Sequence, residues 1–270
     1  MRNLFDIKDR VIVITGGTGV LGSCMVEYLA EQGAKVAVLA RNEEKGNELV
    51  SSVKSKGFEA SFYKTDVNDM EVVEKTASEI MQRYGRVDVL VNGAGGNQAG
   101  ATIGPDKTIF DLNIDAFKKV VDLNLFGTVI PTMVFAKIMA KQKQGNIINI
   151  SSEAALRPLT RVVGYGAAKA AVTNFTKYLA TELASKFGEN LRVNAFAPGF
   201  FISEQNRALL TNPDGSLTAR GNTIIAHTPF ARFGEPEELL GTLHWLASDA
   251  SKFVTGTLTV IDGGFDAFCI

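Results

Sequence analysis

The sequence predicts an α/β fold in which a doubly wound, parallel sheet of seven strands is covered by helices on both faces. Short apolar runs rich in β-branched residues alternate along the chain with longer segments of helical periodicity. The runs are apolar throughout rather than alternating, which is typical of strands buried on both faces. No linker, repeat or low-complexity stretch divides the 270 residues, so we expect a single domain over residues 1–270.

The first half of the chain supplies four strands and three helices. The run 11–15 is β-branched throughout and is followed by glycines, and residues 20–32 repeat apolar positions at helical spacing until Gly33. Residues 35–40 are again apolar, and 43–56 are helical. The run 58–65 turns Phe58, Ala60 and Phe62 to one side, as a strand does. A helix over 69–84 and a strand over 87–92 complete this half.

The second half continues the alternation. We expect a long helix over 114–141 with a bend near Pro131, a strand over 146–151, a long helix over 163–187 and a strand over 191–197. A helix over 236–248 and a strand over 258–262 close the chain. Residues 95–112 and 200–234 break the alternation and follow the carboxyl ends of strands, where doubly wound folds bind ligands. Both segments are therefore predicted to be functional loops.

The composition excludes several classes of function. Hydrophobic residues make up 46% of the chain and charged residues 21%, with a net charge of −1 and a pI of about 6.2. The basic residues are scattered, so neither nucleic acid nor an anionic membrane is an expected partner. The first ten residues are too charged for a signal peptide, and no run of about 18 apolar residues predicts a membrane helix. Two distant cysteines, Cys24 and Cys269, predict no disulfide framework or metal site, and a cytoplasmic location is expected.

A glycine-rich loop joins the first strand to the first helix and predicts a dinucleotide site of the Rossmann type. Its glycines, Gly16, Gly19 and Gly22, let the backbone approach a pyrophosphate, which the helix N-terminus attracts. At the end of the second strand, Arg41 stands where an acidic residue would bind the ribose of NAD. Its forked guanidinium suits the 2′-phosphate of NADP, so we predict NADP, with NAD as the alternative. A solvated arginine at a helix start is the competing interpretation.

Tyr165 and Lys169 lie four residues apart in the helix predicted over 163–187, so they share one face of it. An ammonium beside a phenol favours the phenolate and lowers the phenol's pKa toward working pH. Such a tyrosine can exchange a proton with a carbon–oxygen bond. By itself this spacing is common on surface helices. The pair indicates a catalytic function only together with the rest of the sequence.

With the glycine loop, Tyr165 and Lys169 in place, the chain resembles the short-chain dehydrogenase/reductase family over nearly its whole length, in the compact single-domain branch. Ser152 lies thirteen residues before Tyr165, at the position of the family's catalytic serine, and this spacing decides against Ser151. Asn124 lies in Asp-Leu-Asn-Leu, where the family keeps an asparagine. Pro198-Gly199, with Ser203 five residues after the proline, matches the turn that holds the nicotinamide amide.

Two positions depart from the family pattern. The compact branch usually carries Thr-Gly-x-x-x-Gly-x-Gly, whereas here Val20 stands at the middle glycine and Gly19 precedes it. The resulting spacing is closer to that of the branch that contains epimerases, and it leaves the backbone path near the pyrophosphate open. Gly93 replaces the second asparagine of the family's Asn-Asn-Ala-Gly turn. Neither departure removes a catalytic group.

The resemblance implies hydride transfer between a nicotinamide and a carbonyl carbon. Tyr165 would act as general acid/base, Lys169 would lower its pKa and bind the ribose, and Ser152 would bind the substrate oxygen. Asn124 would hold a water that connects Lys169 with solvent. The cofactor-binding residues implied by the glycine loop and the family motifs are Gly16, Thr18, Gly19, Val20, Leu21, Arg41, Asp66, Val67, Asn92, Ala94, Gly95, Tyr165, Lys169, Pro198, Gly199, Phe201 and Ser203.

Within the family, three stretches look like the bacterial D-mannonate oxidoreductases (fructuronate reductases) of this fold. They are Gly-Gly-Asn-Gln after the fourth strand, the segment 200–207, and the tail Asp-Gly-Gly-Phe-Asp. A sugar acid requires a cation for its carboxylate and polar groups for its hydroxyls. Candidate substrate residues, for each of which surface exposure is the competing interpretation, are Asn97, Gln98, Glu153, Gln205, Asn206 and Arg207.

Several alternatives remain open at this point. The activity could be that of a gluconate, polyol or 3-ketoacyl enzyme of the same family, and the glycine spacing also admits an epimerase. A dinucleotide-binding regulator without catalysis predicts a damaged Ser-Tyr-Lys set, whereas Ser152, Tyr165 and Lys169 are all present. By analogy with the family a homotetramer is expected. The apolar tail from Phe265 is expected to pack against the protein.

Overall fold

The computed structural model describes residues 2–202 and 207–268. One parallel sheet runs through the protein with the strand order β3-β2-β1-β4-β5-β6-β7. Its strands are β1 (Val11–Thr15), β2 (Lys35–Ala40), β3 (Ala60–Lys64), β4 (Val89–Asn92), β5 (Gly145–Ile150), β6 (Leu191–Pro198) and β7 (Leu258–Ile261). The predicted seven-stranded, doubly wound Rossmann-type sheet is confirmed. Chain order reverses between β1 and β4, and a ligand crevice is expected at the carboxyl ends of these neighbouring strands.

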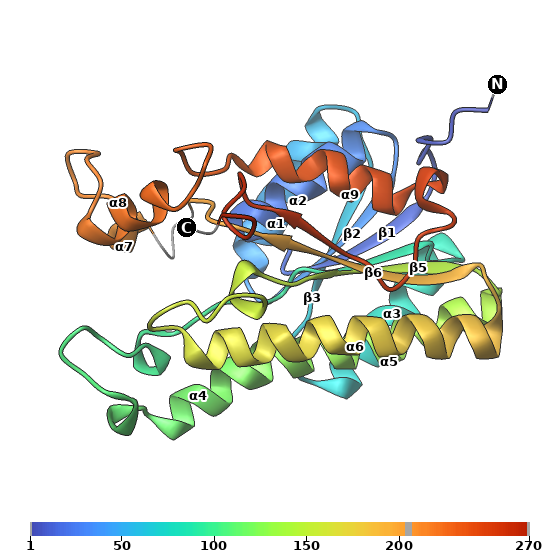
Figure 1. The fold of residues 1–270 in the computed structure, drawn as a ribbon. Helices are drawn as coiled ribbons and strands as arrows, with labels where there is room; N and C mark the ends of the chain where they lie inside the picture. The colour runs from blue at the N-terminus through green and yellow to red at the C-terminus, as the bar shows by residue number, and fades with distance from the viewer. Residues whose placement is uncertain (1, 203–206, 269–270) are drawn as a thin grey trace.

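Helices cover both faces of the sheet (Figure 1). The longer ones are α1 (Val20–Glu31), α2 (Glu43–Ser55), α3 (Met70–Tyr84), α4 (Ile114–Val121), α5 (Gly127–Gln142), α6 (Val163–Phe187), α8 (Ala219–Ala226) and α9 (Leu240–Ala247). Helices α1, α2 and α9 pack with Ile12 and Ile14 in one core cluster. Helices α3, α5 and α6 pack with Val11 and Val13 in the other. Alternate residues of β1 therefore serve opposite cores, as the period of a strand requires.

The segment predicted as one helix over 114–141 contains a π-helical turn, Asp122–Phe126, between α4 and α5. The expected site of irregularity was Pro131, which instead lies inside α5. The turn contains Asn124, whose side chain is buried and donates from Nδ2 to Gly96 O at 2.7 Å and Val120 O at 2.8 Å. The wider turn thus coincides with a side chain that reaches across to the loop after β4.

By length and composition, the combined helix Ile114–Gln142 could cross a membrane, with a mean hydropathy of 1.5 over its most apolar window. In the fold it packs against β4, β5, α3 and α6. Its buried side includes Thr128 and Thr132 beside apolar residues such as Phe135. Its apolar composition is therefore accounted for by its place as a core helix under the sheet.

The two predicted functional loops contain short helices that the sequence patterns did not reveal. The 95–112 segment holds 3₁₀ turns at Ala99–Ala101 and Ile109–Asp111. The 200–234 segment holds α7 (Arg207–Leu210) and α8, whose N-terminus is capped by the Thr218 side chain. Short helices such as these bury few residues, so they leave little apolar periodicity in the sequence. Both segments extend from the same end of the sheet (Figure 1).

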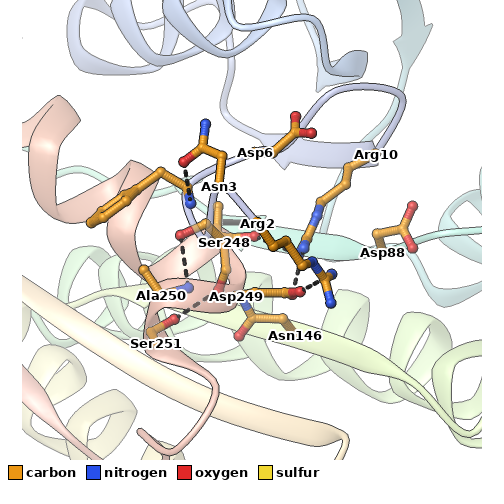
Figure 2. A network of polar contacts seen from close by, with 12 residues as sticks. Arg2, Asn3, Asp6, Arg10, Asp88, Asn146, Ser248, Asp249, Ala250 and Ser251 are labelled. Carbon is orange, nitrogen blue, oxygen red and sulfur yellow. Dashed lines mark hydrogen bonds and ion pairs between the residues drawn. The ribbon is translucent and has the colours of Figure 1, made fainter.

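The other end of the sheet is closed by a polar network that ties the N-terminal segment to the chain after α9 (Figure 2). Asp249 accepts from both Arg2 and Arg10 at 2.5 Å. Beside it, Asn146 at the start of β5 donates to Leu246 O at 2.6 Å. The network lies away from the ligand end, so it belongs to the frame of the fold.

The C-terminal tail packs against the protein, as expected, as far as the structure describes it. The rings of Phe265 and Phe200 meet edge to face with centroids 5.0 Å apart. Arg157 donates to the Asp266 carboxylate at 2.8 Å. The tail therefore lies over the segment that follows β5 and β6, next to the loops that carry the candidate site.

Candidate active site

The glycine loop forms a tight backbone cradle at the start of α1. Gly16 has φ +68°, and a Cβ there would lie 2.8 Å from Ala94 Cα. A Cβ on Gly22 would lie 2.3 Å from Gly16 O, closer than any side chain tolerates. Gly19 is the N-cap of α1 and provides no side-chain cap, so the helix N-terminus faces an uncapped loop. A concave backbone surface at a helix N-terminus suits the pyrophosphate of a dinucleotide.

The departure at Val20 does not distort the cradle. Val20 is the first residue of α1, and its side chain is 36% exposed and lines the cavity next to the loop. The Gly19 N–H donates to Gly16 O at 3.1 Å, and the Ser23 N–H donates to Gly19 O at 2.7 Å. The loop thus passes directly into the helix with a side chain at the family's middle-glycine position.

At the end of β2, Arg41 does not cap the following helix. Asn42, not Arg41, caps α2, because its side chain accepts from Lys45 N at 3.0 Å. Arg41 is exposed and lines the cavity. None of the ion pairs found among the described residues involves it. Its position therefore suits a ligand group at the rim of the dinucleotide site.

Ser152, Tyr165 and Lys169 come together at the carboxyl end of β5. Ser152 follows β5 and lies close enough to the Tyr165 phenol to lower its pKa. One turn along α6, Lys169 is 3% exposed, and its Nζ lies 5.7 Å from the centroid of the Tyr165 ring. That Nζ donates to Ile150 O at 2.7 Å, which holds the ammonium beneath the site.

The neighbouring serine has a structural contact instead. The Ser151 hydroxyl is buried and lies 2.6 Å from Thr173 Oγ1 on α6. Ser152 is the one beside the phenol, as the thirteen-residue spacing predicts. The choice between the two serines therefore agrees with the geometry.

The acid–base balance of the pair differs from the expectation that Lys169 lowers the pKa of Tyr165. Burial raises the pKa of Tyr165, and the Ser152 hydrogen bond opposes that rise only in part. Burial also lowers the pKa of Lys169 to about 8. Both groups lie in a poorly solvated environment, which disfavours phenolate and ammonium alike. Without ligands, Tyr165 is therefore held as the neutral phenol, the form that can donate a proton.

Asn124 positions the loop that crosses the site. Beyond its Nδ2 contacts, its Oδ1 accepts from Gly96 N at 3.1 Å. A Cβ on Gly95 would lie 2.7 Å from Asn124 Oδ1 and 3.3 Å from Lys169 Nζ, so loop, asparagine and lysine meet at one point. The Asn124 amide is fully committed to backbone groups. A role in a water relay stays a prediction.

Most of the predicted residues line one cavity of about 1090 Å³ that runs from the glycine loop to α8. It contacts the loop after every strand from β1 to β6. The predicted residues that line it are Gly16, Thr18, Gly19, Val20, Leu21, Arg41, Val67, Ala94, Gly95, Asn97, Gln98, Ser152, Glu153, Tyr165, Lys169, Pro198, Gly199 and Phe201. Ser203, Gln205 and Asn206 lie outside the described residues.

Besides Asn124, whose contacts are given above, three predicted residues do not line the cavity. The Asn92 side chain is buried and donates to Thr132 Oγ1 and Asn149 Oδ1, both at 2.8 Å, so it fixes the core under the turn rather than facing a ligand. Asp66 is exposed, and its carboxylate accepts from Asn68 N at 3.0 Å. Arg207 is exposed at the start of α7. Asn92 therefore has a supporting role, whereas Asp66 and Arg207 lie at the rim.

Glu153 is the most unusual polar group of the site. Its side chain is 1% exposed, lines the cavity directly after Ser152, and has no partner for either carboxylate oxygen among the described residues. Burial, followed by the charges of Asp266 and Asp262 and opposed by Arg157, raises the pKa of Glu153 to about 7. The group can therefore be a neutral hydrogen-bond donor near neutral pH.

The sequence patterns missed a set of cations at the far end of the cavity. Lys107, Arg161 and Arg220 all line it, from the 95–112 loop, the segment before α6, and α8. Each is an isolated cation in the sequence, so no motif marks it. The nearest available signal is that Arg161 lies four residues before Tyr165.

The fold, the cradle and the Ser152–Tyr165–Lys169 group together define an oxidoreductase, and the chain belongs to the short-chain dehydrogenase family. The profile of that family, "short chain dehydrogenase", matches residues 10–214. A relative from Bacillus subtilis, an uncharacterized oxidoreductase named UxuB, is 43% identical, with 97% of each chain covered.

Two solved structures are also similar along their whole length. One, from Haemophilus influenzae and provisionally named a D-mannonate oxidoreductase, has NAD bound; it is 41% identical with a TM-score of 0.91, covering 98% of this chain and 97% of its own. The other, a gluconate 5-dehydrogenase from Burkholderia cenocepacia in complex with NADP and tartrate, is 31% identical with a TM-score of 0.87 and 98% coverage of both. Solved relatives thus hold either dinucleotide, in agreement with the predicted NADP and the alternative NAD.

Proposed function

We propose that this enzyme reduces the ketone of a sugar acid of the D-fructuronate type to a D-mannonate-type hydroxy acid, or runs the reverse oxidation, in the cytoplasm. The observation that carries the substrate class is the lining of the cavity: beside the Ser152–Tyr165 pair it holds amides, a buried carboxyl and cations. Such groups match the hydroxyls and carboxylate of a sugar acid and would be left unpaired by an apolar substrate.

A nicotinamide dinucleotide fits the site. The cradle at Gly16, Gly19 and Gly22 would take its pyrophosphate, and Arg41 the 2′-phosphate of NADP. When bound, the cofactor would supply or accept the hydride. Lys169 would bind the ribose hydroxyls, from a buried position that its bond to Ile150 O keeps fixed.

The protein's own groups would handle the proton. Ser152 would donate a hydrogen bond to the substrate oxygen as negative charge develops there. Tyr165, held as a neutral phenol, would transfer its proton to that oxygen during reduction and recover it during oxidation. Glu153, buried and without a partner, would bind a hydroxyl next to the reacting carbon.

A substrate panel tests this proposal. Purified enzyme would be assayed at 340 nm with D-fructuronate and NADPH or NADH, and with D-mannonate and the oxidised cofactors. D-Gluconate, a polyol and a 3-ketoacyl thioester would be run in parallel. We expect the sugar acids to give the highest kcat/KM. Turnover of another carbonyl without activity on sugar acids would discard the substrate and keep the reaction class. Gluconate is the second candidate because of the similar gluconate 5-dehydrogenase.

Arg41 gives a separate test of the cofactor. Replacing Arg41 with Asp should move the preference from NADPH toward NADH, because a carboxylate repels a 2′-phosphate and accepts from a ribose hydroxyl. The ratio of kcat/KM for the two cofactors is the measurement. Lys54→Asp, on the exposed last turn of the neighbouring helix, is the control for net charge. An unchanged ratio would show that Arg41 does not contact this part of the cofactor.

A further inference from the structure

Two arginines face the same end of the cavity without a carboxylate between them. Arg161 lies just before α6, and Arg220 lies in the first turn of α8. Their charges are close enough that Arg161 adds to the lowering of the pKa of Arg220 that burial causes. In the described part of the chain, neither guanidinium belongs to an ion pair with an acidic side chain.

The Arg220 side chain is held in place by the segment that leads to the catalytic tyrosine. Its Nη1 donates to Thr160 Oγ1 at 3.1 Å, and its Nη2 lies 3.3 Å from Thr160 O. Helix α8 is thereby attached to the segment that leads, five residues later, to Tyr165. An arginine so fixed presents its remaining donors in a defined direction.

Arg161 is fixed through its backbone. Its φ of +76° lies in the left-handed region, which is unusual for a residue with a side chain. Its carbonyl accepts from Ile103 N at 3.0 Å, which connects it to the 95–112 loop. Unusual backbone geometry of this kind clusters at ligand sites. Both functional loops thus converge on the pair, one at Arg161 and one at Arg220.

Two like charges in a half-buried site repel each other and lose hydration, so the arrangement is favourable only when an anion joins them. We propose that Arg161 and Arg220 form the carboxylate subsite of the substrate, with the reacting carbonyl toward Ser152 and Tyr165. The inference rests on the proposed sugar-acid function. It replaces Arg207, which is exposed and does not line the cavity, as the expected carboxylate partner.

The test compares a charged with a neutral substrate. D-Fructuronate carries the carboxylate, whereas D-fructose offers a ketone on a chain that lacks it. For Arg161→Gln, we expect KM for fructuronate to rise by about 10-fold to 100-fold, as loss of a charged hydrogen bond predicts. The rate with fructose should stay within about twofold, since no carboxylate is involved.

Two further variants separate binding from folding. Arg161 makes no side-chain hydrogen bond among the described residues, so Arg161→Gln should fold normally even if Arg220→Gln loosens α8. Arg83→Gln, on the exposed surface of α3, removes the same charge away from the cavity and should leave KM unchanged. Thermal unfolding of each variant would confirm that the fold is intact.

The outcomes distinguish this inference from the proposed function. Turnover of fructuronate with an unchanged KM in both arginine variants would overturn the carboxylate subsite and leave the function standing. If the wild type does not reduce sugar acids, D-gluconate would be titrated as an inhibitor of whichever carbonyl is reduced. A weaker inhibition by gluconate in Arg161→Gln would then support the subsite without the function, and equal inhibition would overturn both.

Discussion

At the scale of single residues, burial shifts the pKa values of the groups proposed to carry out the chemistry. Tyr165 and Lys169 lose hydration, which raises the pKa of one and lowers that of the other, so the site holds both in their neutral forms more readily than water does. Glu153 shows the same effect on a carboxyl. Perturbed groups that share one cavity are the pattern expected of an active site.

Glu153 should make the stability of the protein depend on pH. The pKa is 4.5 for an ordinary glutamate and about 7 in the folded protein, so between these values only the unfolded chain releases the proton. The free energy of unfolding should therefore fall as pH rises through that window. In Glu153→Gln this loss disappears. The thermal midpoint of Glu153→Gln, relative to that of wild type, should be higher at pH 8 than at pH 5.

Equal changes of the thermal midpoint with pH in wild type and Glu153→Gln would contradict this expectation. They would mean that the Glu153 carboxyl is hydrated or paired in the folded protein. Glu71→Gln on the exposed start of α3 is a matched control, with the same chemical change outside the cavity. The change in thermal midpoint between pH 5 and pH 8 in Glu153→Gln is compared with the change in this control.

At the scale of elements, backbone geometry rather than side chains builds the cofactor end of the site. The glycine loop joins β1 to α1 with so little room that Gly22 and Gly16 O are nearly in contact. The π-turn at Asp122–Phe126 has a related function, since it places Asn124 against Gly96. Adding or removing a single atom in such a feature is enough to disturb it.

Gly22→Ala and Gly19→Ala form a matched pair in this loop. A Cβ on Gly22 would lie 2.3 Å from Gly16 O, whereas one on Gly19 would have Gly16 O at 3.5 Å, an ordinary contact. We expect Gly22→Ala to lower the free energy of unfolding by about 1–3 kcal/mol despite the better helix propensity of alanine. Gly19→Ala meets no clash and should lower it by about 0.5 kcal/mol, the small cost of alanine at an N-cap.

Urea unfolding without cofactor measures this difference, because it separates the loop's own packing from ligand binding. Equal stability of the two variants would show that the loop adjusts freely, and the tight cradle would then not be a property of the protein.

At the scale of the whole molecule, much of the architecture could be predicted from the sequence. Apolar runs and glycines located every strand within two residues of its observed ends, because strands buried on both faces leave an uninterrupted apolar pattern. The Ser152, Tyr165 and Lys169 positions followed from spacing on two adjacent elements. What depends on contacts between distant segments could not be predicted. Examples are the approach of Arg220 to Thr160 and the inward turn of Asn92.

The network around Asp249 joins the N-terminal segment to the segment after α9, and its removal should weaken the whole fold. Burial opposes ionisation, but the hydrogen bond and charge of Arg10, with the charge of Arg2, leave the pKa of Asp249 below its ordinary 3.8. The stabilisation is therefore complete at higher pH and is lost as pH falls below 3.8 through the folded value. Asp249→Asn should reduce the free energy of unfolding in urea equally at pH 7 and pH 5.

Asp115→Asn is the control for this network, since Asp115 forms an exposed pair with Lys118 at 3.8 Å. It should leave the unfolding midpoint nearly unchanged. Equal effects of the two substitutions would mean that the Asp249 network does not stabilise the attachment of the N-terminal segment.

Proton transfer by Tyr165 is tested most directly by the turnover of Tyr165→Phe. The substitution removes one oxygen and leaves the ring that packs above Lys169, so cofactor binding followed by fluorescence of the reduced dinucleotide should be nearly unchanged. With the best carbonyl substrate, kcat should fall by about 10²-fold to 10⁴-fold, the usual contribution of a general acid. A variant that binds cofactor and retains kcat within about tenfold of wild type would contradict proton transfer by Tyr165.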